Sequence, residues 1–177
     1  MITVEIIIKR GFIYMSQIQQ QVFDKLNTMG IKYKAVWHPA VYTVEDINQL
    51  CIPAGNEVAK NLFLHDDKKK RYFLVVLPKD KKVDLKELRV KLNSRRLSFA
   101  SEEELHTYMG LNKGSVTPFG ILNDNSCSVE VIFDQDLVLF QEVGVHPNEN
   151  TATVWLHAKD LEKVIREHGN NFAYIEI

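Results

Sequence analysis

The sequence predicts an α+β fold: one domain in which helices surround a mixed β-sheet that can curl toward a barrel. Three observations support this class. The chain has 177 residues, enough for one domain with a substantial core, and 45 % of them are hydrophobic. Its apolar runs are mostly short and separated by turns, as strands are. Patterns with helical spacing fall near both ends of the chain and in its middle.

The first half of the chain contains a clear helix start and a hairpin. Ser16 is an N-cap for a helix with apolar residues at helical spacing, and Gly30 ends that helix. We expect strands at 31–37, 58–64 and 72–77 and a short helix at 43–50. The last two strands flank a polar turn rich in Lys and Asp, which predicts a β-hairpin.

The second half has two capping-box motifs, in which the residue before a helix and the third helical residue bond each other. They are Asp84 with Glu87 and Ser101 with Glu104, and the helix after Ser101 ends at Gly110. We expect a further helix at 158–168 and strands at 129–133, 137–141, 151–156 and 172–177.

Residues 1–14 are apolar but carry Glu5, Lys9 and Arg10 within the run. A signal peptide would place its basic residues first and a small-residue cleavage site last, and neither is present. One interpretation is an edge strand over residues 2–9, and the other is an extension that precedes the true start at Met15. We therefore expect the domain to occupy residues 15–177, with residues 1–14 as an N-terminal extension.

Charge and cysteine content exclude several classes of protein. Lys and Arg total 22 against 23 Asp and Glu, so the formal net charge is −1 and a protein basic over its whole surface is excluded. The two cysteines, Cys51 and Cys127, form no disulfide framework, which favours a reducing compartment such as the cytoplasm. No apolar run reaches the roughly 18 residues that a membrane span needs, so no membrane partner is expected.

The charge is unevenly distributed along the chain. Residues 60–96 contain 13 Lys or Arg against five Asp or Glu, whereas the remainder contains nine against 18. A concentrated basic segment is typical of a protein that contacts phosphates, although solvated turns and helix faces are also rich in Lys.

Three short segments carry residues suited to chemistry. Lys60 interrupts an apolar strand and precedes Asn61; such a Lys either reaches outward to solvent or serves a carbonyl oxygen or a phosphate. The loop 114–118 combines glycine, two hydroxyl residues and proline, and its amides can bind an oxyanion, although many connections share this composition. His146, before Pro147, either forms a turn or works as an acid or base.

Several other catalytic motifs are missing from the sequence. The loop 114–118 lacks the Gly-Lys-Ser/Thr ending of a Walker loop, and there is no G-x-S-x-G nucleophile elbow. The six histidines show no spacing typical of metal ligands. We therefore expect neither a metal site nor a cofactor.

Five segments, taken in order, resemble the prolyl-tRNA editing family of YbaK-like aminoacyl-tRNA deacylases. They are HPAVYTVED at 38–46, AKNLFLHDDKKKRYFLVVLP at 59–78, LSFASEEEL at 97–105, KGSVTPFGILND at 113–124 and HPNENTATV at 146–154. The resemblance covers about residues 17–177 and leaves 1–14 without a counterpart. It implies a partly barrel-like mixed sheet wrapped by helices, and an enzyme that hydrolyses the ester joining a wrong amino acid to tRNA.

The resemblance also implies roles for individual residues. Lys60 matches the family's active-site lysine, which would hold the substrate carbonyl or the terminal ribose and phosphate. Gly114 begins the matching G-x-x-x-P loop, whose amides would stabilise the oxyanion, and His146 matches the histidine that lines the amino-acid pocket. The residues expected to bind the substrate around them are Asn61, Ser115, Val116, Thr117, Pro118, Tyr42 and Thr43.

The branch that the sequence most resembles removes alanine from prolyl-tRNA. The alternatives are removal of cysteine or another amino acid, or a non-catalytic role in binding an amino acid or tRNA. Water would attack the ester without a covalent nucleophile or a cofactor. The implied partners are the acceptor end of aminoacyl-tRNA and prolyl-tRNA synthetase, and both a monomer and a homodimer fit the sequence. The cations expected to contact the acceptor stem are Lys68, Lys69, Lys70, Arg71, Arg95 and Arg96.

Overall fold

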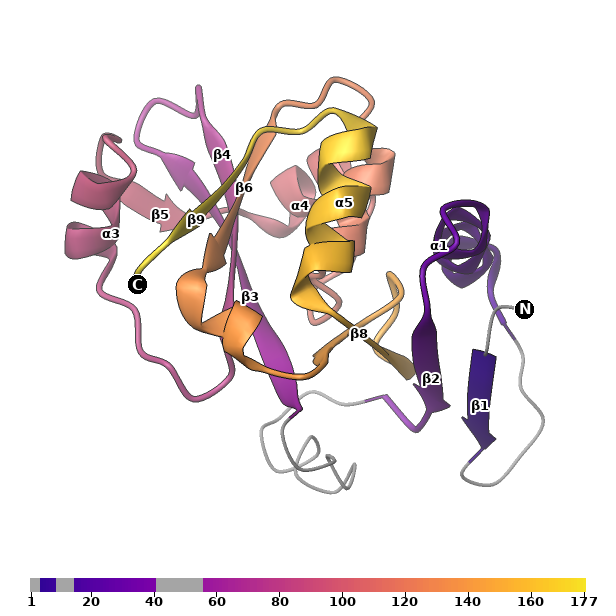
Figure 1. Cartoon of the computed structure of the whole chain (residues 1–177). Coiled ribbons are helices and arrows are strands. Elements are labelled where there is room, and N and C mark those ends of the chain that lie inside the picture. The colour runs from indigo at the N-terminus through magenta and orange to yellow at the C-terminus, as the bar shows by residue number, and fades with distance from the viewer. Residues whose placement is uncertain (1–3, 9–14, 41–55) are drawn as a thin grey trace.

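The structure is a computed structural model that describes residues 4–8, 15–40 and 56–177 (Figure 1). Within these ranges nine strands form one mixed sheet. The strands are β1 (Val4–Ile8), β2 (Tyr33–Trp37), β3 (Glu57–Asp66), β4 (Tyr72–Pro78), β5 (Leu97–Phe99), β6 (Val129–Asp134), β7 (Val143–Val145), β8 (Ala152–Leu156) and β9 (Phe172–Ile175). The helices are α1 (Gln17–Thr28), α3 (Leu85–Lys91), α4 (Glu102–Met109) and α5 (Ala158–His168), with 3-10 helices η1 (Pro118–Asn123) and η2 (Gln135–Leu139).

The strand order along the sheet is β1-β2-β8-β7-β3-β4-β6-β9, and β5 pairs with β3. β3 and β4 form the predicted antiparallel hairpin, whereas β4, β6 and β9 run parallel to one another. The described sheet is open, because its path runs from β1 to β9 without the two ends pairing. The predicted α+β class with a single mixed sheet is confirmed.

Two apolar clusters fill the two faces of the central strands. The larger cluster packs against α1, α4 and α5, and the smaller one packs against α3 through Leu88. β4 is buried at every residue because its side chains alternate between them: Leu74 and Val76 enter the larger cluster, Val75 and Leu77 the smaller. This explains why β4 is a continuous apolar run in the sequence.

The helix ends confirm most of the predicted capping. Ser16 begins α1 and Ser101 begins α4, each in a complete capping box. α4 ends at Gly110, whose φ of 62° is in the left-handed region that glycine adopts at low cost. Asp84 caps α3 by accepting a bond from the Lys86 amide. The second bond of the predicted capping box, from the Asp84 amide to the Glu87 side chain, is not found among the described residues. Only half of that predicted box therefore forms.

Some predicted elements differ from the structure. The strand expected at 137–141 is wrong, because residues 135–139 form η2. The Asp134 side chain accepts a bond from the Asp136 amide and turns the chain into this helix. The three-residue strands β5 and β7 were too short to predict from an apolar pattern. The helix expected at 43–50 lies outside the described residues.

The apolar N-terminal run does contain a strand. β1 pairs in parallel with β2 at the edge of the sheet, as expected from the edge-strand interpretation of residues 2–9. In the ranges that the structure describes, no helix is long and apolar enough to cross a membrane.

Candidate functional site

Lys60 and Asn61, adjacent in β3, lie on opposite faces of the sheet. Successive side chains of a strand point to opposite sides. Asn61 pairs with Val76, which belongs to the larger apolar cluster, and Lys60 pairs with Leu77, which belongs to the smaller one. The two residues that the sequence placed in one pocket therefore project to different sides of β3.

Asn61 connects β3 to the loop 114–118. Its amide Nδ2 donates a hydrogen bond of 3.0 Å to the carbonyl oxygen of Val116. Its Oδ1 is buried and has no hydrogen-bond partner in the described part of the chain. Asn61, Gly114 and Val116 line a cavity of about 430 Å³ together with Phe63 and Phe99. Asn61, which lines the cavity, thus carries one buried acceptor that no described residue engages.

The edge of β3 beside this cavity is open. β3 pairs with β7 only through Glu57–Val58 and with β5 only through Leu64–Asp66. Among the described residues, 59–62 therefore have no strand partner on that edge, Phe63 is bonded there by the Ala100 amide, and the cavity lies against this edge. A bound group can reach β3 here without displacing a neighbouring strand.

The loop 114–118 is held at both ends. Gly114 has a φ of 84°, in the left-handed region that only glycine enters readily. The Ser115 amide donates to the Asn112 carbonyl, and the fully buried Thr117 donates from Oγ1 to the His146 carbonyl at 2.6 Å. The amides of Val116 and Thr117 donate to no residue in the described ranges. Pro118 begins η1 directly after the loop. Within the described ranges, the loop thus has two unpaired amides of the kind that an oxyanion needs.

The ring of His146 has one nitrogen that can accept a hydrogen bond, although His146 does not line the cavity beside Asn61. Its Nδ1 lies 3.1 Å from the Ala152 carbonyl and must donate to it, which leaves Nε2 with its lone pair in the neutral ring. Burial lowers the pKa of His146, and the nearby His38, whose ring centroid is 6.5 Å away, lowers it further. A neutral imidazole at pH 7 follows.

Lys60 is held apart from this group. Its ammonium group donates to the Lys81 carbonyl. Lys81 in turn pairs with the fully buried Asp134 at 2.8 Å and with Asp136 at 2.7 Å. The structure thus brings Asn61, the loop and His146 together, and places Lys60 beside Lys81. The expected pocket neighbours Tyr42 and Thr43 lie outside the described residues.

Half of the cations expected to contact tRNA are engaged with carboxylates. Arg71 makes a two-pronged ion pair with Glu130, at 2.7 and 2.8 Å. Lys69 pairs with Glu104 at 3.0 Å, and Arg95 pairs with Asp67. The other three have no ion pair in the described part of the chain: Lys68, Lys70 and Arg96.

One polar residue near the site was missed by the sequence analysis. Asn148 is 2 % exposed, and both atoms of its side-chain amide lack a hydrogen-bond partner among the described residues. Its φ of 64° is left-handed, which asparagine tolerates better than most residues. The nearest signal in the sequence is its place two residues after His146. No group of three or more His, Cys, Asp or Glu within the described ranges is arranged to hold a metal ion.

Comparison with known proteins identifies the class. The profile of the aminoacyl-tRNA editing domain matches residues 38–164, which include β3, the loop and His146. The chain belongs to this family. It is an aminoacyl-tRNA deacylase, a hydrolase that edits mischarged tRNA.

The relatives place it among editing proteins connected with proline. The prolyl-tRNA editing protein ProX of Acetoanaerobium sticklandii is 47 % identical over 159 residues, covering 90 % of this chain and 97 % of that protein. Prolyl-tRNA synthetase associated domain-containing protein 1 of Danio rerio is 31 % identical, covering 85 % and 82 %. A crystal structure described as a candidate trans-editing enzyme for prolyl-tRNA synthetase has the same fold, with a TM-score of 0.72 at 22 % identity over 93 % of this chain and 99 % of that one.

Proposed function

We propose that this protein hydrolyses the ester of alanine wrongly attached to prolyl-tRNA. The proposal rests on two hydrogen bonds that join Asn61, the loop 114–118 and His146. Asn61 donates to the Val116 carbonyl of the loop, and Thr117 of the loop donates to the His146 carbonyl. It is supported by the names of its relatives, of which one is a prolyl-tRNA editing protein and another, 26 % identical over 122 residues, is the proline–tRNA ligase of Chlamydia caviae.

The reaction is needed because a synthetase discriminates only weakly against an amino acid smaller than its own. A site built for proline loses only about 1–3 kcal/mol of apolar contact when a smaller amino acid enters. Binding alone therefore cannot reject alanine strongly, and a second site must destroy the wrong ester. We accordingly propose that the protein works in the cytoplasm, on the acceptor end of tRNA, alongside prolyl-tRNA synthetase.

In the proposed mechanism, water attacks the ester carbonyl and no covalent enzyme intermediate forms. The carbonyl oxygen gains negative charge and accepts bonds from the free amides of Val116 and Thr117. Nε2 of His146 accepts a bond from the attacking water and orients it. The bond between the carbonyl carbon and the ribose oxygen then breaks, and the water proton ends on that ribose oxygen. The unengaged Oδ1 of Asn61 accepts a bond from the substrate's ammonium group.

Lys60 keeps its proposed role in holding the substrate's carbonyl, ribose or phosphate. Lys60 projects to the face of β3 opposite Asn61, and its ammonium group donates to the Lys81 carbonyl. That role therefore requires the substrate to reach around the open edge of β3 and to replace this bond. We expect Lys60→Ala to lose nearly all deacylation, with Lys60→Arg as the charge-preserving control. Full activity in Lys60→Ala would remove Lys60 from the site.

The decisive experiment is a panel of charged tRNAs. Purified protein should deacylate Ala-tRNA(Pro) much faster than Cys-tRNA(Pro) and leave Pro-tRNA(Pro) intact. Faster release of cysteine would assign the second candidate substrate instead. Binding of free alanine or proline without any deacylation would make the protein a non-catalytic sensor and refute the proposal.

Gly114→Ala tests the loop in the same panel. A Cβ at a φ of 84° forces the loop to rearrange, so deacylation should fall strongly. Unchanged turnover would show that the loop only connects α4 to η1. Gly30→Ala is the matched control, since its φ is also left-handed, at 64°, and it lies outside the site.

A further inference from the structure

A second cavity carries only positive charge. It has a volume of about 460 Å³ and is lined by Lys86 and Arg89 of α3, by Arg96, and by two leucines. None of these three cations has an ion pair in the described part of the chain, whereas Arg71 and Arg95 nearby are paired with carboxylates. We call this cavity the α3 groove. Three cations around one hollow, none in an ion pair within the described ranges, favour a polyanionic ligand.

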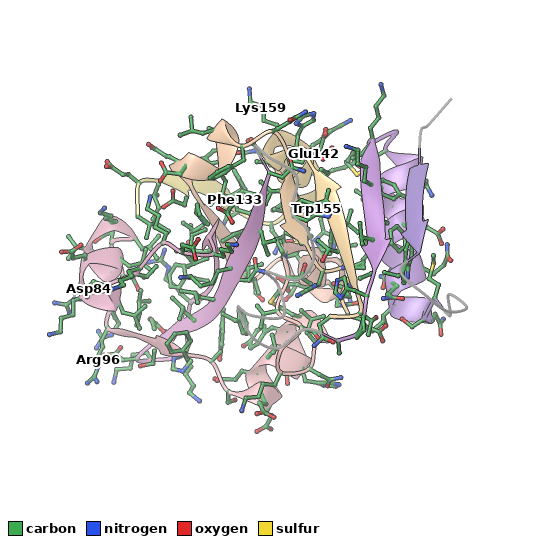
Figure 2. All side chains as sticks on the ribbon, turned by 90° about the horizontal axis from the view of Figure 1, so that it is seen from below. Asp84, Arg96, Phe133, Glu142, Trp155 and Lys159 are labelled. Carbon is green, nitrogen blue, oxygen red and sulfur yellow. The ribbon has the colours of Figure 1, made fainter. Side chains whose placement is uncertain are left out.

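The α3 groove and the cavity beside Asn61 lie at the two ends of β5. Arg96 and Leu97 line the groove, and Phe99 with Ala100 lines the other cavity. Two residues of a strand span about 7 Å. The groove lies on the face that α3 covers and the cavity on the face of Asn61, but among the described residues β5 pairs only with β3, so a short ligand can pass around its other edge to reach both. Figure 2 shows Arg96 near Asp84, the N-cap of α3, at the end of the molecule away from Lys159.

Phe99 lines the cavity beside Asn61 and follows Leu97, which lines the α3 groove, by two residues. It is 61 % exposed, and single exposed apolar residues are common on protein surfaces. Its position is what matters: the ring lies at the cavity beside Asn61, one strand away from the cations of the α3 groove. An accessible aromatic ring beside a cationic groove is the arrangement that binds single-stranded nucleic acid, through stacking and phosphate contacts.

We propose that β5 carries the single-stranded 3′ end of the tRNA, with a base stacked on Phe99 and the phosphates in the α3 groove. The inference rests on the proposed function and adds to it, since it states how the RNA is held while the ester lies in the neighbouring cavity. Of the cations expected from the sequence it keeps Arg96, and it replaces those of the hairpin turn, where Lys69 and Arg71 are paired, with Lys86 and Arg89.

The test measures RNA binding without any reaction. The probe is a short uncharged RNA that ends in CCA and carries a fluorescent label at its 5′ end, followed by anisotropy. Phe99→Ala should weaken binding by about 5- to 150-fold, because it removes one stacked base. Phe99→Tyr should bind like the wild type. Leu139→Ala is the matched control, since Leu139 is 79 % exposed and belongs to η2.

A second variant tests the groove. Lys86→Gln with Arg89→Gln removes two phosphate contacts, so the slope of log affinity against log salt should become shallower by about 1.4. Lys159→Gln, an exposed cation far from the groove, should leave the slope unchanged (Figure 2). Binding within twofold of the wild type in both Phe99→Ala and the double variant would overturn the proposal. The proposal would also be overturned if these variants weakened binding of prolyl-tRNA synthetase and left RNA binding unchanged, because the surface would then be a protein interface.

Failure of this inference can be told apart from failure of the proposed function. If the protein binds the CCA-ended RNA through Phe99 but hydrolyses no charged tRNA, the RNA site stands and the proposed reaction fails. If Ala-tRNA(Pro) is hydrolysed and Phe99→Ala has wild-type KM and RNA affinity, the reaction stands and the RNA site fails. With both correct, Phe99→Ala raises KM for aminoacyl-tRNA while kcat changes little.

Discussion

Removing the Thr117 hydroxyl should both destabilise the protein and disturb the site. Thr117 is fully buried, and its Oγ1 donates to the His146 carbonyl at 2.6 Å. Thr117→Val keeps the branched shape but leaves that carbonyl without this donor. An unsatisfied buried polar group costs about 1–3 kcal/mol. In a chain of this size, each kcal/mol lowers Tm by about 2–4 °C, so Tm should fall by about 2–12 °C.

Thermal and urea unfolding would measure this cost, and Thr117→Ser provides the control. Serine keeps the donor and loses only a methyl group, so it should recover most of the activity. Deacylation by Thr117→Val should fall at temperatures where the variant is folded, because the loop and His146 are no longer tied together. A valine variant with wild-type Tm and turnover would refute the view that this bond joins the two parts of the site.

Three further predictions concern pH and packing. Because burial lowers the pKa of His146, kcat/KM should decline with falling pH only below the range in which an ordinary histidine titrates, and His146→Gln should abolish that decline. Burial raises the pKa of Glu104, but bonds from the Ser101 amide and its neighbours outweigh it and lower the pKa to about 2. Glu104→Gln should therefore lower Tm at pH 7, and its difference from wild type should shrink as pH falls from 4.5 to about 2. Gly144→Ala would place a Cβ 2.8 Å from the Trp155 ring and should cost about 1–3 kcal/mol in urea unfolding.

Each of these has a contrary outcome. An acid limb that survives His146→Gln would assign the titration to another group. A Tm difference for Glu104→Gln that is equally large at pH 7 and at pH 2 would mean that packing, not the carboxylate's charge, is responsible. An unchanged urea midpoint for Gly144→Ala would show that the ring moves aside freely.

Signals confined to a few neighbouring residues predicted the helices and the hairpin. The Ser16 and Ser101 caps act within one turn, so the sequence alone contains all the partners. Residues 137–141 were mispredicted because the deciding contact is an Asx turn at Asp134, which an apolar pattern does not report. β5 pairs with β3, and β7 pairs with both β3 and β8, so these short strands depend on partners elsewhere in the chain.

The candidate site was only partly predictable for the same reason. Asn61 meets Val116 across 55 positions, a contact that no local motif encodes. Arg71 is neutralised by Glu130, which lies 59 positions away, so counting cations along the sequence overestimated the charge of the hairpin turn. The α3 groove was missed because its cations are spread over 86–96 and meet only in three dimensions.

The opposite orientation of Lys60 and Asn61 makes strand register a functional property. Moving β3 by a single position against β4 would exchange the faces of the two residues, carrying Asn61 away from the loop and Lys60 toward it. The turn between β3 and β4 lies beyond the pairing, so a change in its length is compatible with the same alignment. One residue inserted or deleted within β3 would instead reverse the two side chains while leaving the composition and most of the sheet intact.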